Sequence, residues 1–184
     1  SNTLIFTTST TTITRISGFV DGNFRKVIAT GAPSVTFEVG KSGVYSPLTL
    51  AFTGVTVSGS MTCSASVPDH PSVASSPLNP TKTVNRYWSI TNNATTFTSY
   101  NATFNFVAGD IDVGAITGNF RVYRYSGTAW SSTTAGVRTA TSTQFTGEVA
   151  ANLPNGAQQD FAVGEVVVTT TVFNALLTGN WSSA

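Results

Sequence analysis

The sequence predicts an all-β protein, built as an antiparallel two-sheet β-sandwich. Alternation with a period of two residues recurs along the chain, and helical periodicity is nearly absent. Of the 184 residues, 53 are serine or threonine and only 9% are charged. Threonine prefers extended backbone and its hydroxyl tolerates water, so it can cover the outer face of a sheet without charge. Glycine, proline, asparagine and aspartate separate these runs with no helix between them, which favours a sandwich over a parallel α/β sheet.

Six alternating runs define the expected strands of the body. In each of them one set of alternate residues is apolar and the other is hydroxyl-rich or polar. Trp88 shares the apolar face of its run with Val84 and Ile90, so we expect it in the core. We expect about eight to ten strands in an immunoglobulin-like or jelly-roll-like arrangement. The runs cover residues 35–39, 48–52, 61–67, 84–90, 102–106 and 120–125.

Turn signals divide the chain further. Ser126-Gly127 predicts a two-residue hairpin turn that leads towards Trp130. The segment 68–82 contains four prolines, and because proline removes ladder donors we expect a long surface loop there. We interpret 17–165 as the sandwich domain, with strand-like extensions at 1–16 and 166–184.

Both extensions are strongly β-prone. The first contains Leu4, Ile5 and Phe6 and has no charge before Arg15. In the second, Val166, Val168 and Val172 share one face of an extended chain, and Val167 and Phe173 share the other. A strand that is apolar on both faces needs cover on both sides. It is either an internal strand of its own sandwich or an arm that completes the sheet of a neighbouring copy.

The bulk composition narrows the range of partners. A formal net charge of +1 argues against nucleic acid, and no apolar run approaches the roughly 18 residues of a membrane span. A chain of low charge lacks the repulsion that keeps copies apart, so self-association is favoured. The chain begins at Ser1 without a basic and apolar leader, which we interpret as the mature end of an exported protein.

No catalytic centre can be assembled from these residues. The single histidine, His70, lies between Asp69 and Pro71, and we expect it to be a solvent-exposed loop residue rather than a catalytic base. Cys63 lies on an apolar face and is expected to be a buried thiol. One histidine and one cysteine cannot make a zinc site. Glu38 and Glu148 are the carboxylates that would have to form a glycosidase pair, and nothing in the sequence brings them together. We therefore expect no cofactor.

Four weaker patterns involve polar or aromatic side chains. Asp110 and Asp112, followed by Gly114, could supply part of a calcium cage, although two acids that solubilise a turn are the more common arrangement. Arg86 shares the inward face with Trp88, so we expect it to have a carboxylate partner. Outward-facing aromatic residues could form a platform that stacks on sugar rings. Its candidate residues are Tyr123, Tyr125 and Trp130, and the candidate glycosylation sequons begin at Asn93, Asn101 and Asn180.

Several stretches together resemble β-sandwich modules of large secreted bacterial surface and adhesin-like proteins. They are GFVDGNFRK (18–26), TFEVG (36–40), YSPLTL (45–50), VNRYWSITNN (84–93), YNATFNF (100–106), FRVYRYSGTAW (120–130) and DFAVGE (160–165). The resemblance implies an extracellular or cell-surface location and a non-catalytic role. This chain differs from that pattern in standing as one module with a β-prone extension at each end.

Two main hypotheses follow for the function, and a hydrolase that depends on Glu38, Glu148 or His70 ranks behind both. The first is a structural subunit of an extracellular filament, whose copies are joined to one another by β-strand addition. The alternative is a carbohydrate-binding or adhesive surface module.

Overall fold

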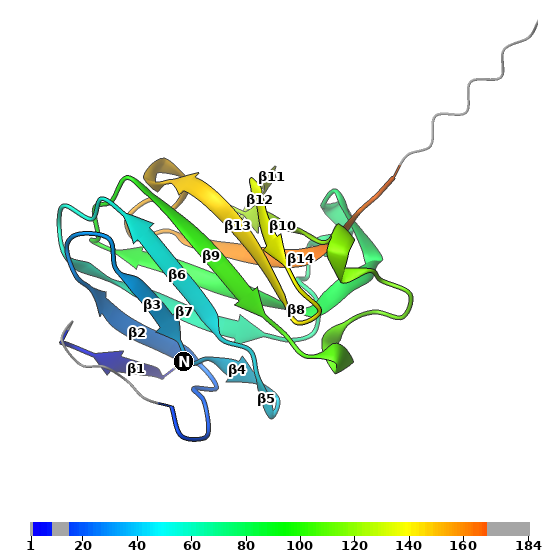
Figure 1. Ribbon diagram of the computed structural model, residues 1–184, viewed down its shortest axis with the longest axis horizontal. Coiled ribbons are helices and arrows are strands. Elements are labelled where there is room, and N and C mark those ends of the chain that lie inside the picture. The colour runs from blue at the N-terminus through cyan, green and yellow to red at the C-terminus, as the bar shows by residue number, and fades with distance from the viewer. Residues whose placement is uncertain (1, 9–14, 169–184) are drawn as a thin grey trace, which may run out of the picture.

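The computed structural model describes residues 2–8 and 15–168, and it confirms the predicted β-sandwich. Two sheets pack face to face (Figure 1). The order of the larger sheet is β1 (Thr3–Phe6), β2 (Asn23–Ile28), β7 (Gly59–Ser66), β8 (Leu78–Asn93), β14 (Gln158–Val166), β10 (Arg121–Tyr125) and β11 (Trp130–Ser132). The order of the smaller sheet is β12 (Ala135–Arg138), β13 (Ser142–Val149), β9 (Ser99–Asn105), β6 (Leu48–Thr53) and β3 (Ser34–Phe37).

Short elements complete the described part of the chain. A two-stranded ribbon is formed by β4 (Gly40–Lys41) and β5 (Val44–Tyr45), and four short 3₁₀ turns lie in the connections. They are η1 (Val73–Ser75), η2 (Ala108–Asp110), η3 (Thr117–Asn119) and η4 (Ala150–Asn152). The described residues form fourteen strands, more than the eight to ten expected, because strands of two to four residues are too short to show alternation.

The core lies between the two sheets and is rich in aromatic rings. Phe104, Phe145 and Phe161 pack with centroid distances of 5.5–5.8 Å. Trp88 is fully buried, as predicted, and its indole N–H donates to the Ser46 carbonyl at 3.0 Å. Cys63 is also fully buried, as predicted, and burial raises the pKa of its thiol well above the ordinary value. An inward-facing thiol of this kind is unreactive.

Two predicted boundaries were wrong. The proline-rich loop does not extend to residue 82, because β8 begins at the buried Leu78, which pairs with Val166. Pro80 is exposed where the β8–β14 register shifts, so its missing N–H interrupts no regular pairing. The hairpin between β10 and β11 has a four-residue loop, because Tyr125 pairs with Trp130 and the Ser126 N–H donates to the Ala129 carbonyl.

The two ends of the described chain are placed differently. β1 lies at the edge of the larger sheet and pairs in parallel with β2, whereas the other pairs of named strands are antiparallel. β14 is an internal strand flanked by β8 and β10. Beyond it, the Val167 N–H donates to the Pro77 carbonyl and Val168 is 85% exposed. The chain therefore leaves the sandwich at the end away from β1 (Figure 1).

Candidate functional site

The first candidate region is the edge of the sandwich formed by β1. The inner side of β2 faces β3, the last strand of the smaller sheet, since the rings of Phe24 and Phe37 lie 6.1 Å apart. β1 therefore extends the larger sheet beyond the edge of the smaller one (Figure 1). The segment 15–20 covers part of the inner side of β1, and its Val20 pairs with Val39.

A groove of about 360 Å³ lies between β1 and this segment, and we call it the N-terminal groove. Its floor contains Leu4, Phe6 and Phe24, and the rings of Phe6 and Phe24 meet edge to face at 5.4 Å. Ile16 lies at its rim and is 93% exposed. The lining is mostly apolar, so the groove is suited to apolar side chains. The lining residues are Leu4, Phe6, Arg15, Ile16, Ser17, Gly18, Phe19, Val20, Phe24 and Glu38.

The two charged residues of the N-terminal groove are already engaged with neighbours. The Tyr45 hydroxyl donates to the Glu38 carboxylate, and burial together with this carboxylate raises the pKa of Tyr45 to about 12. The Arg15 guanidinium stacks over the Tyr45 ring at 3.8 Å, and its Nε donates to the Gly18 carbonyl. These contacts are with neutral groups, so they orient the two charged side chains without neutralising them.

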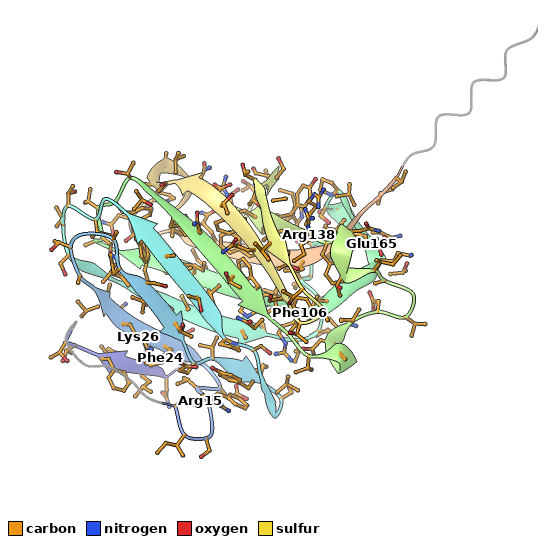
Figure 2. All side chains as sticks on the ribbon, viewed as in Figure 1. Arg15, Phe24, Lys26, Phe106, Arg138 and Glu165 are labelled. Atoms are coloured by element: carbon orange, nitrogen blue, oxygen red, sulfur yellow. The ribbon has the colours of Figure 1, made fainter. Side chains whose placement is uncertain are left out.

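Lys26 lies on the inner face of β2, where an apolar residue is usual. Its Nζ donates to the Thr36 carbonyl of β3 and lies 4.6 Å from the centroid of Phe24. Burial lowers the pKa of this amine, and the nearby Glu38 acts in the opposite direction. Figure 2 shows Lys26, Phe24 and Arg15 together at this end of the molecule. Lys26 thus ties the two sheets together next to the N-terminal groove.

The second candidate region lies on the outer face of the larger sheet, where three aromatic rings surround His70. Its ring centroid lies 4.9 Å from Tyr87, 4.8 Å from Tyr125 and 4.9 Å from Trp130. We call these four residues the histidine cluster. His70 Nδ1 accepts from the Ser72 N–H at 3.1 Å, so Nε2 carries the proton of the neutral ring and faces Asp160 Oδ2 at 3.3 Å.

The expectation that His70 is solvent-exposed was wrong, because it is 5% exposed. Its partners Tyr87, Tyr125 and Asp160 come from three neighbouring strands of the sheet. His70 and Asp160 are ninety residues apart in the sequence, so the sequence alone could not predict this contact. The outward-facing Tyr87 of β8, with Tyr123 and Tyr125 at alternate positions of β10, was the one available signal of an occupied outer face.

The predicted aromatic platform is partly covered. Tyr123 and Trp130 pack against a small cluster formed by Val73, Leu78 and Ala162. The Trp130 indole N–H donates to the Ser72 carbonyl at 3.1 Å, so its polar group is used within the protein. Tyr125 and Trp130 lie 5.0 Å apart with their planes at 43°, and they both contact His70. The three residues remain partly exposed, and the rings of Tyr125 and Trp130 do not lie in one plane.

The acidic residues proposed for calcium bind protein donors instead. Both oxygens of Asp110 accept from Arg86, at 3.2 Å and 3.1 Å. Asp110 is therefore the carboxylate partner expected for this buried arginine. Asp112 accepts from the Thr83 N–H at 2.8 Å and from Asn85 at 2.9 Å. Within residues 2–8 and 15–168, no three histidine, cysteine or acidic side chains are grouped so as to hold a metal ion.

The two candidate glycosidase carboxylates are not brought together. Glu38 follows β3, whereas Glu148 lies on β13, three strands away across the smaller sheet. Strands lie about 4.8 Å apart, so this separation alone is roughly 14 Å, beyond the spacing of an acid pair that acts on one bond. Glu148 is buried and accepts from the Asn152 amide at 2.6 Å.

The remaining predicted residues fall in two groups. Asn93 and Asn101 are partly buried, and their side-chain oxygens accept from Thr62 and from the Gly147 N–H. Val172, Phe173 and Asn180 lie outside the described residues. Among the residues that the structure describes, no helix has the length and apolar character that would cross a bilayer.

Comparisons with protein-family models, with curated proteins and with solved structures found no match to this chain.

Proposed function

We propose that this chain is a non-catalytic structural subunit of an extracellular or cell-surface filament, in which neighbouring copies are joined by β-strand addition. The observation that carries this proposal is the unprotected edge at β1. Leu4 and Ile5 are about half exposed there, and one parallel ladder of four residue pairs holds the strand to β2. Among the described residues, no strand pairs with the other edge of β1, and an edge of this kind next to apolar side chains is a template for another strand.

The other edges of the two sheets carry features that discourage such pairing. At β3, the Thr36 carbonyl already accepts from Lys26 of β2, so this backbone acceptor is used within the protein. At β12, Arg138 and an irregular register interrupt the ladder, and β11 has only three residues. β1 has no charge, no proline and no bulge. This contrast supports β1 as the edge that is used for assembly.

The electrostatic character of the chain supports the same proposal. Charged residues make up 9% of the sequence, and the formal net charge is +1. Repulsion between copies is therefore weak, and the hydroxyl-rich faces keep the sandwich hydrated without charge. The carboxylates of four acidic residues accept from protein donors, which supports a non-catalytic role; they are Glu38, Asp110, Asp112 and Glu148.

Charge placed at the β1 edge tests this proposal. The change Ile5→Lys adds a cation to the outer face of the strand, and Val113→Lys is the matched control because Val113 is fully exposed elsewhere. Sedimentation velocity over a concentration series should show oligomers for the unaltered chain and for the control, but a shift to monomer for Ile5→Lys. A monomeric unaltered chain at the highest concentration would reject the proposal.

A second candidate function is carbohydrate binding on the outer face of the larger sheet. The observation in its favour is that Tyr123, Tyr125 and Trp130 lie together and remain partly exposed. Sugar rings stack on such side chains through their apolar faces. Binding on a glycan array that is lost in Tyr125→Ala, with the fold retained, would favour this candidate over the filament subunit.

A further inference from the structure

The two ends of the described chain lie at opposite ends of the sandwich. β1 and the N-terminal groove occupy one end, and the strand β14 leaves the body at the other (Figure 1). Figure 2 shows the same separation, with Arg15 at the groove end and Glu165 near the exit of β14. A contact between the exit of one copy and the groove of the next therefore joins different surfaces. Such a contact is heterologous and, unless it closes into a ring, it propagates as a filament.

The chain beyond β14 has the composition of a donor strand. From Val166 to the last residue the sequence contains no charged side chain. Val167 and Val168 are already exposed where the chain leaves the sheet, at 47% and 85%. An extended conformation of this segment would place Val166, Val168 and Val172 on one face and Val167 and Phe173 on the other. Both faces of this segment are apolar and require cover.

The β1 edge offers cover of that kind on its inner side. A strand paired with the free edge of β1 would direct every second side chain inward, because side chains alternate across a sheet. The inward side chains would meet the N-terminal groove, whose floor and rim include Leu4, Phe6 and Ile16. The outward side chains would lie next to Ile5, which is half exposed. Arg15 and Glu38 carry opposite charges and both contact Tyr45, so the groove has no net charge that would require a charged segment.

We propose that residues 168–173 of one copy pair with the free edge of β1 in the next copy, with Val168 and Val172 in the N-terminal groove. This inference rests on the proposed function, and it identifies the strand that one copy donates and the sheet edge that accepts it in the next copy. The acceptor lies at the opposite end of the sandwich from the donor, so each copy supplies one of each. The filament is then polar, with a free groove at one end and a free C-terminal strand at the other.

Two full-length variants separate the donor from the acceptor. The donor-blocked variant is Val168→Asp with Val172→Asp, and the acceptor-blocked variant is Leu4→Asp with Ile16→Asp. Each variant alone should remain monomeric in sedimentation velocity. Mixed in equal amounts, they should form a one-to-one heterodimer and no larger species, because only one productive contact remains. The matched control, Val113→Asp with Val137→Asp, adds the same charge at exposed positions elsewhere and should assemble like the unaltered chain.

The outcomes distinguish the inference from the proposed function. If the unaltered chain assembles but the acceptor-blocked variant assembles equally well, the groove is not the acceptor and the inference is overturned, whereas the filament function stands. A mixture that stays monomeric while the unaltered chain assembles also overturns the inference. If the unaltered chain does not assemble at all, the proposed function itself fails.

Cysteine pairing distinguishes a neighbour's strand from the chain's own C-terminal segment. One full-length variant carries Ile16→Cys and another carries Val172→Cys, and Cys63 does not interfere because it is fully buried. On mixing under oxidising conditions, a disulfide between the two variants is expected. In a third variant that carries both changes, the disulfide should link different copies. A disulfide confined to monomers would show that the segment fills its own groove, and would overturn the inference.

Discussion

At the scale of single residues, the inward-facing side chains of β8 could be predicted from the sequence. The carboxylate that pairs with one of them, Arg86, could not. Alternation placed Trp88 and Arg86 on the core side, and both are almost completely buried. A buried guanidinium needs a carboxylate, so the sequence also predicted that one would be present. It did not identify Asp110, because a turn twenty-four residues away brings that residue to Arg86.

The Arg86–Asp110 ion pair gives a prediction about stability. The change Asp110→Ala should lower the free energy of unfolding by about 3–5 kcal/mol, because it leaves a buried guanidinium without its counter-charge. Arg86→Met combined with Asp110→Ala removes both charges and should be less destabilising than Asp110→Ala alone. Urea denaturation of the three proteins measures this. A double variant that is less stable than the single one would contradict the explanation.

Asp69 gives a prediction about pH. Burial and the charge of Asp112 raise the pKa of its carboxyl above the ordinary value of 3.8, against a hydrogen bond from Thr83. A carboxyl with a raised pKa destabilises the fold while it is ionised, and this cost disappears as the pH falls through the folded-state pKa towards 3.8. Asp69→Asn should therefore raise the free energy of unfolding at pH 7, by less than about 1 kcal/mol because the group is partly exposed.

Denaturation curves at pH 7 and near pH 4 check this prediction, and the gain from Asp69→Asn should shrink at the lower pH. Asp112→Asn is the contrasting variant. Asp112 accepts from the Thr83 N–H and from Asn85, so this change should destabilise the protein at pH 7. A loss of stability at pH 7 in Asp69→Asn would contradict the assignment.

At the scale of elements, the long alternating strands were predictable and the short or covered ones were not. The runs at 48–52, 61–67 and 102–106 became β6, β7 and β9, because each has one face in the core. The parallel pairing of β1 with β2 was not predicted, since it depends on how residues 15–20 cross to the smaller sheet. The loop before β8 was predicted, but its attachment to the sheet through His70 was not.

The histidine cluster gives a prediction about this loop. His70→Ala removes the contacts with Tyr87, Tyr125 and Trp130 and the acceptor of the Ser72 N–H. Amide hydrogen exchange over 70–76 should become at least about tenfold faster, which corresponds to ~1.4 kcal/mol of local stability. Exchange in β6 and β9 should be unchanged.

Thr128→Ala, at the exposed tip of the β10–β11 hairpin, is the control for that measurement. It should leave exchange over 70–76 as it is. Unchanged protection of the loop in His70→Ala would show that the cluster does not hold the loop on the sheet.

At the scale of the whole molecule, assembly depends on features that the sequence only partly indicated. The β-prone, uncharged ends were evident, and so was the low overall charge. What sequence reasoning could not supply is the arrangement of the ends, because it depends on the strand order of the larger sheet. That order places β1 at the edge of the described sheet and makes β14 internal, and Val167 and Val168 leave the sheet at the end away from β1 (Figure 1).

Electron microscopy of the purified full-length chain tests the central claim most directly. Concentrated protein should contain unbranched fibres one sandwich wide, with the same repeat in the Val113→Lys control and none in Ile5→Lys. Fields that contain only separate particles, at concentrations where the chain stays folded, would contradict the assembly of this protein through shared strands.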